Sequence, residues 1–175
     1  MQSIINFIKL IALAIILIFL HYVVSYLFPP PFNNLNIIFV AVILFIMGWE
    51  SSASIWLAFI FNFFIELYSA TPFGLVIVSN VVSVALVYML YVYIFTNRSW
   101  YSAVALSSIA IVFYRIIYSI LFISLNFSSV GLSIGWETVA VSYFWELLLT
   151  AVVSGLAVLV LSKVLDRFKS QQMFF

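Results

Sequence analysis

The fold is decided by residues 62–75, NFFIELYSATPFGL, where a carboxylate lies in an apolar run and a turn of small residues follows. The carboxylate is Glu66, the turn contains Pro72 and Gly74, and hydrophobic sequence continues on both sides. In such an apolar chain, a charged residue within an apolar run calls for a structural or functional explanation. A charged side chain at the centre of a membrane helix costs about 2.5–3.5 kcal/mol or more, and is by default a functional-site hypothesis. Glu66 is therefore the first candidate functional residue.

The composition predicts an integral membrane protein. The chain has 175 residues, of which 67% are hydrophobic and 6% are charged, whereas soluble domains carry about 25% charged residues. The apolar runs are long and show no strand-like alternation, which favours helices over a barrel. We expect an all-α, polytopic bundle that forms a single integral membrane domain over residues 1–175.

Charge and cysteine content exclude several classes of function. The formal net charge of +1 indicates no partner, and since no basic stripe is present, nucleic acid is not expected. The lipid bilayer is the partner expected from the apolar composition. The chain has no cysteine, which excludes disulfides and thiolate catalysis. No phosphate-binding glycine loop or serine–histidine–aspartate pattern is present. We therefore expect neither a cofactor nor a catalytic triad.

Breaks in the apolar sequence predict six transmembrane helices. Their expected ranges are about 4–28, 35–47, 53–69, 75–95, 100–126 and 136–164. The basic residues used to orient them are Lys9, Arg98, Lys163, Arg167 and Lys169, all on one side of a six-span topology, and the loops on the other side hold no Lys or Arg. Cytoplasmic loops carry an excess of Lys and Arg. Both termini are therefore predicted to be cytoplasmic.

Polar residues inside the predicted helices fall in the outer half of the membrane and on inward-facing stripes. This predicted intramembrane cluster contains His21, Asn62, Glu66, Asn80, Arg115, Ser119 and Glu146. Ser142, Glu146 and Thr150 follow one another at four-residue spacing. Arg115 and Glu146 lie at similar depth on consecutive helices and are expected to form an ion pair, with Arg115 also within reach of Glu66.

Two other interpretations of these residues stay open. They can serve only as contacts between helices, which is the plainer explanation for the Ser and Thr residues and an equal one for Asn80 and Glu146. A metal site of His21, Glu66 and Glu146 can also be drawn, although no metal-binding motif supports it.

The turn after the third predicted helix is a candidate docking site for a partner. Its residues are Ser69, Pro72, Phe73 and Gly74. Pro72 is suited to the first turn of the next helix, where its missing N–H would be unpaired anyway. Gly74 has no side chain, so the backbone of a partner helix can approach closely.

Several short hydrophobic spans, with a carboxylate, a small-residue turn and then Pro-hydrophobic-Gly, resemble the MreD family of bacterial rod shape-determining membrane proteins. The matching residues are Glu66, Ser69, Pro72, Phe73 and Gly74. The family usually has Asp at the carboxylate and Gly after the Ser, where this chain has Glu66 and Ala70.

The resemblance implies a non-enzymatic scaffold in the bacterial cytoplasmic membrane. MreD-like proteins act with the bitopic protein MreC and with other proteins of the wall-elongation complex. They are similar in fold to the S-components of energy-coupling-factor transporters, which gives an alternative function, the binding of a vitamin or metabolite. A third possibility, an intramembrane lipid-modifying enzyme, rests only on the buried Glu residues.

Overall fold

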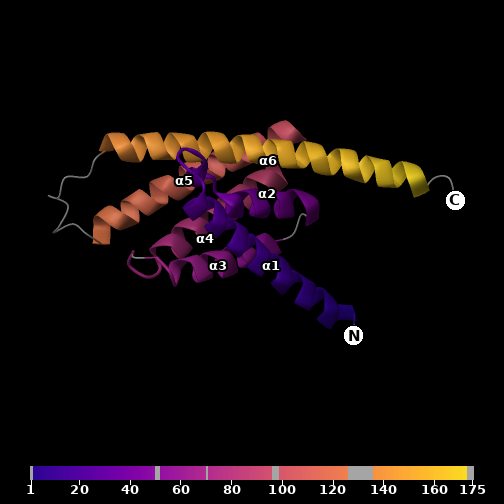
Figure 1. Cartoon of the computed structure of the whole chain (residues 1–175), viewed down its shortest axis with the longest axis horizontal. Helices are drawn as coiled ribbons and strands as arrows, with labels where there is room; N and C mark the ends of the chain where they lie inside the picture. The colour runs from indigo at the N-terminus through magenta and orange to yellow at the C-terminus, as the bar shows by residue number, and fades with distance from the viewer. Residues whose placement is uncertain (1, 50–51, 70, 96–98, 126–135, 173–175) are drawn as a thin grey trace.

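A computed structural model describes residues 2–49, 52–69, 71–95, 99–125 and 136–172, with side chains described over residues 14–48, 52–69, 71–95, 99–125 and 137–163. These ranges contain six α-helices, one short 3-10 helix and no strand (Figure 1). The elements are α1 (Gln2–Leu27), η1 (Phe32–Asn34), α2 (Ile37–Trp49), α3 (Ala53–Glu66), α4 (Leu75–Tyr93), α5 (Trp100–Leu125) and α6 (Trp136–Gln172). The prediction of an all-α membrane bundle is confirmed.

Three of the helices are long and apolar enough to cross a membrane, namely residues Leu75–Tyr93, Trp100–Leu125 and Glu137–Lys163. Residues Ala14–Leu27, Ile37–Gly48 and Ala53–Glu66 are apolar but shorter. A spanning helix needs about 20 residues, so α4, α5 and α6 meet that length and α2 and α3 fall below it. This indicates a membrane protein.

Two predicted helix ends are wrong. α3 ends at Glu66 instead of residue 69, because the chain tightens there: the Tyr68 N–H donates to the Ile65 carbonyl and the Ser69 N–H to the Glu66 carbonyl, each at 3.1 Å. Such tight bonds commonly finish the last turn of a helix. α6 does not stop near residue 164 but continues to Gln172, and Figure 1 shows it projecting beyond the rest of the bundle.

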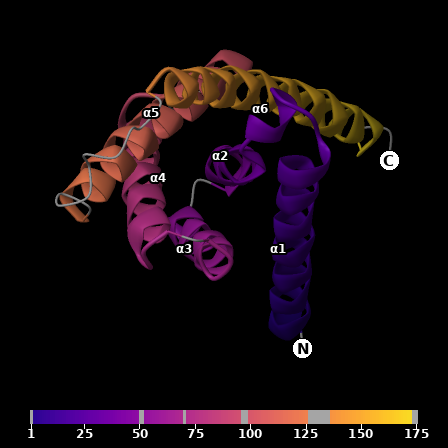
Figure 2. The same cartoon turned by 60° about the vertical axis from the view of Figure 1, so that its left-hand side comes forward.

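Helix α2 is the centre of the bundle. It packs against each of the other five helices, and Figure 2 shows it inside the arc that α6, α5, α4 and α3 make, with α1 on the open side. Ile38, Phe39, Val42, Ile43 and Ile46 are almost completely buried. Since nearly every residue of α2 is a large aliphatic or aromatic one, the helix can be surrounded by neighbours.

Helices α5 and α6 approach closely through small residues. Ser107 and Ser154 share a hydrogen bond of 2.8 Å across the pair. A Cβ at Gly155 would lie 2.7 Å from Cγ2 of Val104, so a larger residue there would require the Val104 side chain or one of the two helices to shift. Small residues commonly allow membrane helices to approach in this way.

The loop between α1 and α2 connects the two sides of the bundle. Within the described residues α1 packs on α2, α3 and η1 but not on α6, while η1 packs on both α1 and α6. The loop contains a cis peptide bond between Pro30 and Pro31. It therefore links the end of α1 to the first turns of α6.

Candidate functional site

Glu66 caps the start of α4. The residue is 3% exposed, and its Oε1 accepts a hydrogen bond from the Val76 N–H at 2.9 Å while Oε2 accepts one from the Ile77 N–H at 3.2 Å. The first N–H groups of a helix have no partner within the helix, and the helix dipole favours negative charge at that end. Both carboxylate oxygens of Glu66 are thus used to join the end of α3 to the beginning of α4.

The other buried polar residues of α3 and α4 face the protein interior, as predicted, and each is 2% exposed or less. Asn62 donates from Nδ2 to the Ala58 carbonyl at 2.7 Å. Ser83 donates to the Ala110 carbonyl of α5 at 2.8 Å. Asn80 is buried as well, but its Oδ1 has no hydrogen-bond partner within the part of the chain that the structure describes. Of these bonds, the one from Ser83 joins two helices, whereas the one from Asn62 lies within α3.

Arg115 of α5 and Glu146 of α6 form the predicted ion pair. The Nε atom of Arg115 donates to Oε2 of Glu146 at 2.6 Å, and a second guanidinium nitrogen contacts the same oxygen. The guanidinium also lies over the ring of Tyr143, 4.0 Å from its centroid. The Glu146 side chain is 4% exposed and the Arg115 side chain 25%. The pair is stabilised by hydrogen bonding and cation–π contact together.

Asn36 extends this pair to the start of α2. Its Nδ2 donates to Oε1 of Glu146 at 3.0 Å, and its backbone N–H donates to Oγ1 of Thr150 at 3.1 Å. Its Oδ1 accepts from the Phe39 N–H at 3.3 Å, which is the geometry of a helix N-cap. Asn36 was not among the predicted residues, although a polar residue before an apolar helix is the usual sequence sign of an N-cap.

The structure does not join the predicted polar residues into one cluster. Arg115 makes its ion pair with Glu146, and both oxygens of Glu66 are bonded to α4, so the expected reach of Arg115 towards Glu66 is wrong. Ser119 is half-buried on α5. His21 is half-buried on α1, and its Nδ1 has no partner among the described residues. Two separate centres result, one at Glu66 and one at Glu146.

The turn between α3 and α4 also differs from its prediction. α4 begins at Leu75, so Pro72 is not in its first turn; the Pro72 carbonyl instead accepts from the Leu75 N–H at 3.3 Å. Gly74 is the N-cap residue with φ of 96°, and a Cβ there would meet nothing within 4 Å. Glycine is thus needed for its left-handed backbone rather than for a close contact. Ser69 bonds to Thr71 at 2.7 Å, and Phe73 is 67% exposed.

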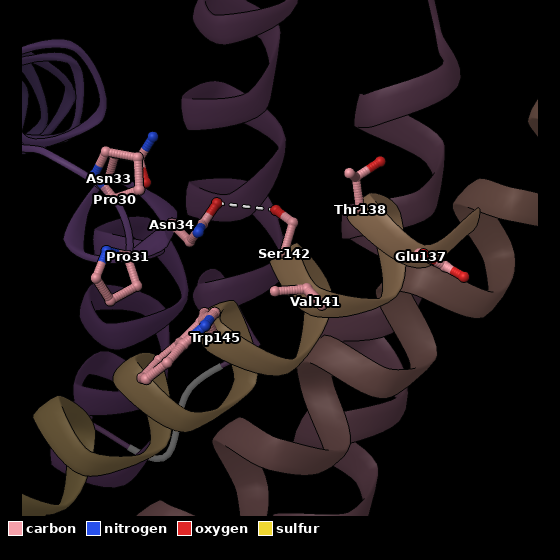
Figure 3. Close-up of a pocket in the computed structure, with 9 residues that line it drawn as sticks. All are labelled: Pro30, Pro31, Asn33, Asn34, Glu137, Thr138, Val141, Ser142 and Trp145. Carbon is pink, nitrogen blue, oxygen red and sulfur yellow. Dashed lines mark hydrogen bonds between the residues drawn. The ribbon is translucent and has the colours of Figure 1, made fainter. Parts of the chain in front are cut away.

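An open groove of about 750 Å³ lies between the α1–α2 loop and the first turns of α6 (Figure 3). On the loop side it is lined by Pro30, Pro31, Asn33 and Asn34. On the α6 side it is lined by Glu137, Thr138, Val141, Ser142 and Trp145. The Ser142 hydroxyl donates to Asn34 Oδ1 at 2.9 Å across it. The groove was not predicted, because the sequence does not reveal that the loop folds against α6.

Among the described side chains no group of three or more His, Cys, Asp or Glu residues is placed to hold a metal ion, so His21, Glu66 and Glu146 do not form the ligand set that could be drawn from the sequence. A comparison of the chain with protein-family models, with curated proteins and with solved structures finds no match. The fold and site thus define an all-α membrane bundle whose buried carboxylates hold helices together.

Proposed function

We propose that the chain is a non-enzymatic scaffold of the bacterial cell-wall elongation machinery, similar to MreD proteins, that binds a single-span MreC-like partner. The observation that carries the proposal is the use of the two buried carboxylates. Both carboxylate oxygens of Glu66 accept hydrogen bonds from backbone N–H groups of α4, and those of Glu146 accept hydrogen bonds from Arg115 and Asn36. A general acid or base needs access to a reacting group. Neither carboxylate has that access without loss of a helix contact.

The turn after α3 is the proposed docking site for the partner. Glu66 fixes this turn from inside, while Tyr68 and Phe73 are 79% and 67% exposed on its outer side. Phe64 of α3 is also exposed. The ring of Phe73 packs edge-on against Phe63 with centroids 6.2 Å apart, and the ring of Tyr68 packs edge-on against Tyr22 of α1 with centroids 6.1 Å apart. Exposed aromatic residues on a rigid support are well suited to a helix partner.

The proposal is tested by co-purification of this chain with an MreC-like protein from the same bacterium. The double variant Tyr68→Ala/Phe73→Ala is expected to lower recovery of the partner by about tenfold, since interface aromatics commonly contribute more than 1 kcal/mol each. Phe144→Ala is the matched control, because Phe144 is an exposed phenylalanine on a different helix. The thermal stability of the isolated chains should differ little.

Unchanged recovery of the partner with the double variant would contradict the docking site. If the chain instead co-purifies with transporter subunits and is stabilised by a vitamin, the S-component function replaces the scaffold.

A further inference from the structure

The mostly apolar lining of the groove beside α6 includes four residues with neutral hydrogen-bonding side chains. They are Asn33, Asn34, Thr138 and Ser142. Among the described residues that line the groove, Glu137 is the only ionisable one, and none is Lys or Arg. A site for phosphate or another anion commonly contains a cation or a row of free N–H groups. The chemistry of this groove therefore favours an uncharged ligand with several hydroxyl groups.

The amides of the loop keep hydrogen-bonding capacity for such a ligand. Asn34 Oδ1 accepts from Ser142, and its two Nδ2 hydrogens make no further bond among the described residues. Asn33 Oδ1 likewise has no partner in that part of the chain. Buried amide groups are nearly always paired with protein or water. Ligand hydroxyls can satisfy both amides, since a hydroxyl both donates and accepts.

Pro30, Pro31, Val141 and Trp145 form the apolar part of the groove lining. Trp145 is half-buried, and its ring lies along one side in Figure 3, near Pro31. A sugar ring has hydroxyls around its edge and C–H groups on its faces. An indole provides a flat surface for those faces, while neighbouring amides and hydroxyls bond the edge. The volume of about 750 Å³ lies within the range of small-ligand sites, about 300–1,000 Å³.

An exposed apolar stripe leads away from the groove along α6. Val141 lines the groove, and Leu148 and Val152 follow it on the same helical face. We propose that the groove binds the uncharged sugar headgroup of a glycolipid, with the acyl chains lying along this stripe. This role goes beyond that of a scaffold and does not depend on a protein partner.

The test uses the whole chain in phosphatidylcholine nanodiscs that contain equal minor fractions of glucosyl-diacylglycerol and phosphatidylglycerol, all with the same acyl chains. Native mass spectrometry measures which lipids the protein retains on release from the disc. We expect the wild type to retain the glucolipid in preference to phosphatidylcholine and to phosphatidylglycerol. Trp145→Leu and Thr138→Val should each lower this retention, Trp145→Leu by about tenfold, which corresponds to about 1.4 kcal/mol.

Trp100→Leu is the matched control, because Trp100 is an exposed tryptophan at the start of α5 and does not line the groove. It should retain the glucolipid as the wild type does. If Trp145→Leu does not fold, Trp145→Phe replaces it, with a smaller expected loss. The melting temperature of each variant in detergent shows whether it is folded.

Methyl β-glucoside added to the discs separates the two sources of the sugar. Displacement of the glucolipid shows that the sugar ring alone is recognised, and failure to displace it shows that recognition needs the lipid-anchored form; both support the proposal. Equal retention of all three lipids, preferred retention of phosphatidylglycerol, or equal losses in Trp100→Leu and Trp145→Leu would overturn it.

Discussion

Asn36 donates from Nδ2 to Oε1 of Glu146 at 3.0 Å, which joins the cap of α2 to the charge pair between α5 and α6. Asn36 also caps α2 through its Oδ1, and Glu146 of α6 is bonded in turn to Arg115 of α5. The three side chains thus connect α2, α5 and α6. A buried charge is tolerated when its partners are complete. Loss of any one member should therefore affect the others.

Arg115→Leu is expected to destabilise the chain by about 3–5 kcal/mol, because Glu146 would remain as a buried carboxylate without its counter-ion. The double variant Arg115→Leu/Glu146→Gln should recover part of that loss, since no unpaired charge remains. Unfolding of the four proteins of this double-mutant cycle in mixed detergent measures the coupling. Strictly additive losses would show that the two side chains do not interact energetically.

Asn36→Ala removes both the cap of α2 and the bond to Glu146, so its cost should exceed the roughly 1 kcal/mol of an N-cap alone. Asn36→Ser keeps a capping oxygen but does not reach Glu146, and its cost should be smaller. Thermal unfolding of the two variants, compared with the wild type, gives both differences. Equal melting temperatures for the Ala and Ser variants would mean that the cap contributes nothing.

Glu66→Ala should cost about 1–3 kcal/mol for each amide left buried and unpaired at the start of α4. Glu66→Gln should cost less, since one side-chain oxygen still accepts a bond. Hydrogen exchange of the Val76 and Ile77 amides is the direct measurement. Both should exchange faster in Glu66→Ala, with amides near the middle of α4 as the internal control.

Gly155→Ala should destabilise the chain by about 1–3 kcal/mol, because its Cβ would overlap Cγ2 of Val104. Val104→Ala removes that atom, so the double variant Gly155→Ala/Val104→Ala should be more stable than Gly155→Ala. The comparison uses melting temperatures in one detergent. No recovery in the double variant would place the strain elsewhere on α5 or α6.

A reporter fused after Phe175 should be active only in its cytoplasmic form, because the predicted loops on the other side of the membrane hold no Lys or Arg. Paired fusions to a cytoplasmic and a periplasmic reporter measure this. Activity of the periplasmic reporter alone would reverse the predicted orientation of both termini.

Much of the architecture could be predicted from the sequence, because helix length and apolar runs are local properties. The pairing of Arg115 with Glu146 followed from equal depth on consecutive antiparallel helices. The role of Glu66 did not follow, since it depends on a turn that brings the amides of Val76 and Ile77 back to the end of α3. Helical periodicity predicts on which face of a helix a residue lies, but it does not predict which element packs against that face.

The groove depends on contacts that are still more distant in the sequence. Asn34 and Ser142 are 108 positions apart, and nothing in either segment alone indicates that they meet. The capping role of Asn36 could have been predicted, because an asparagine before an apolar run predicts a helix cap. Its hydrogen bond to Glu146 could not have been predicted from the sequence.

The central position of α2 has a consequence for the order of biosynthesis. This helix has 13 residues, about 20 Å of rise, which is shorter than the hydrocarbon core of a bilayer. Its capping residue, Asn36, bonds to Glu146 and Thr150, which leave the ribosome more than a hundred residues later. The hydrogen bonds at the cap of the central helix therefore form only after α6 has been synthesised. The packing of the N-terminal half of the chain depends in this way on the C-terminal half.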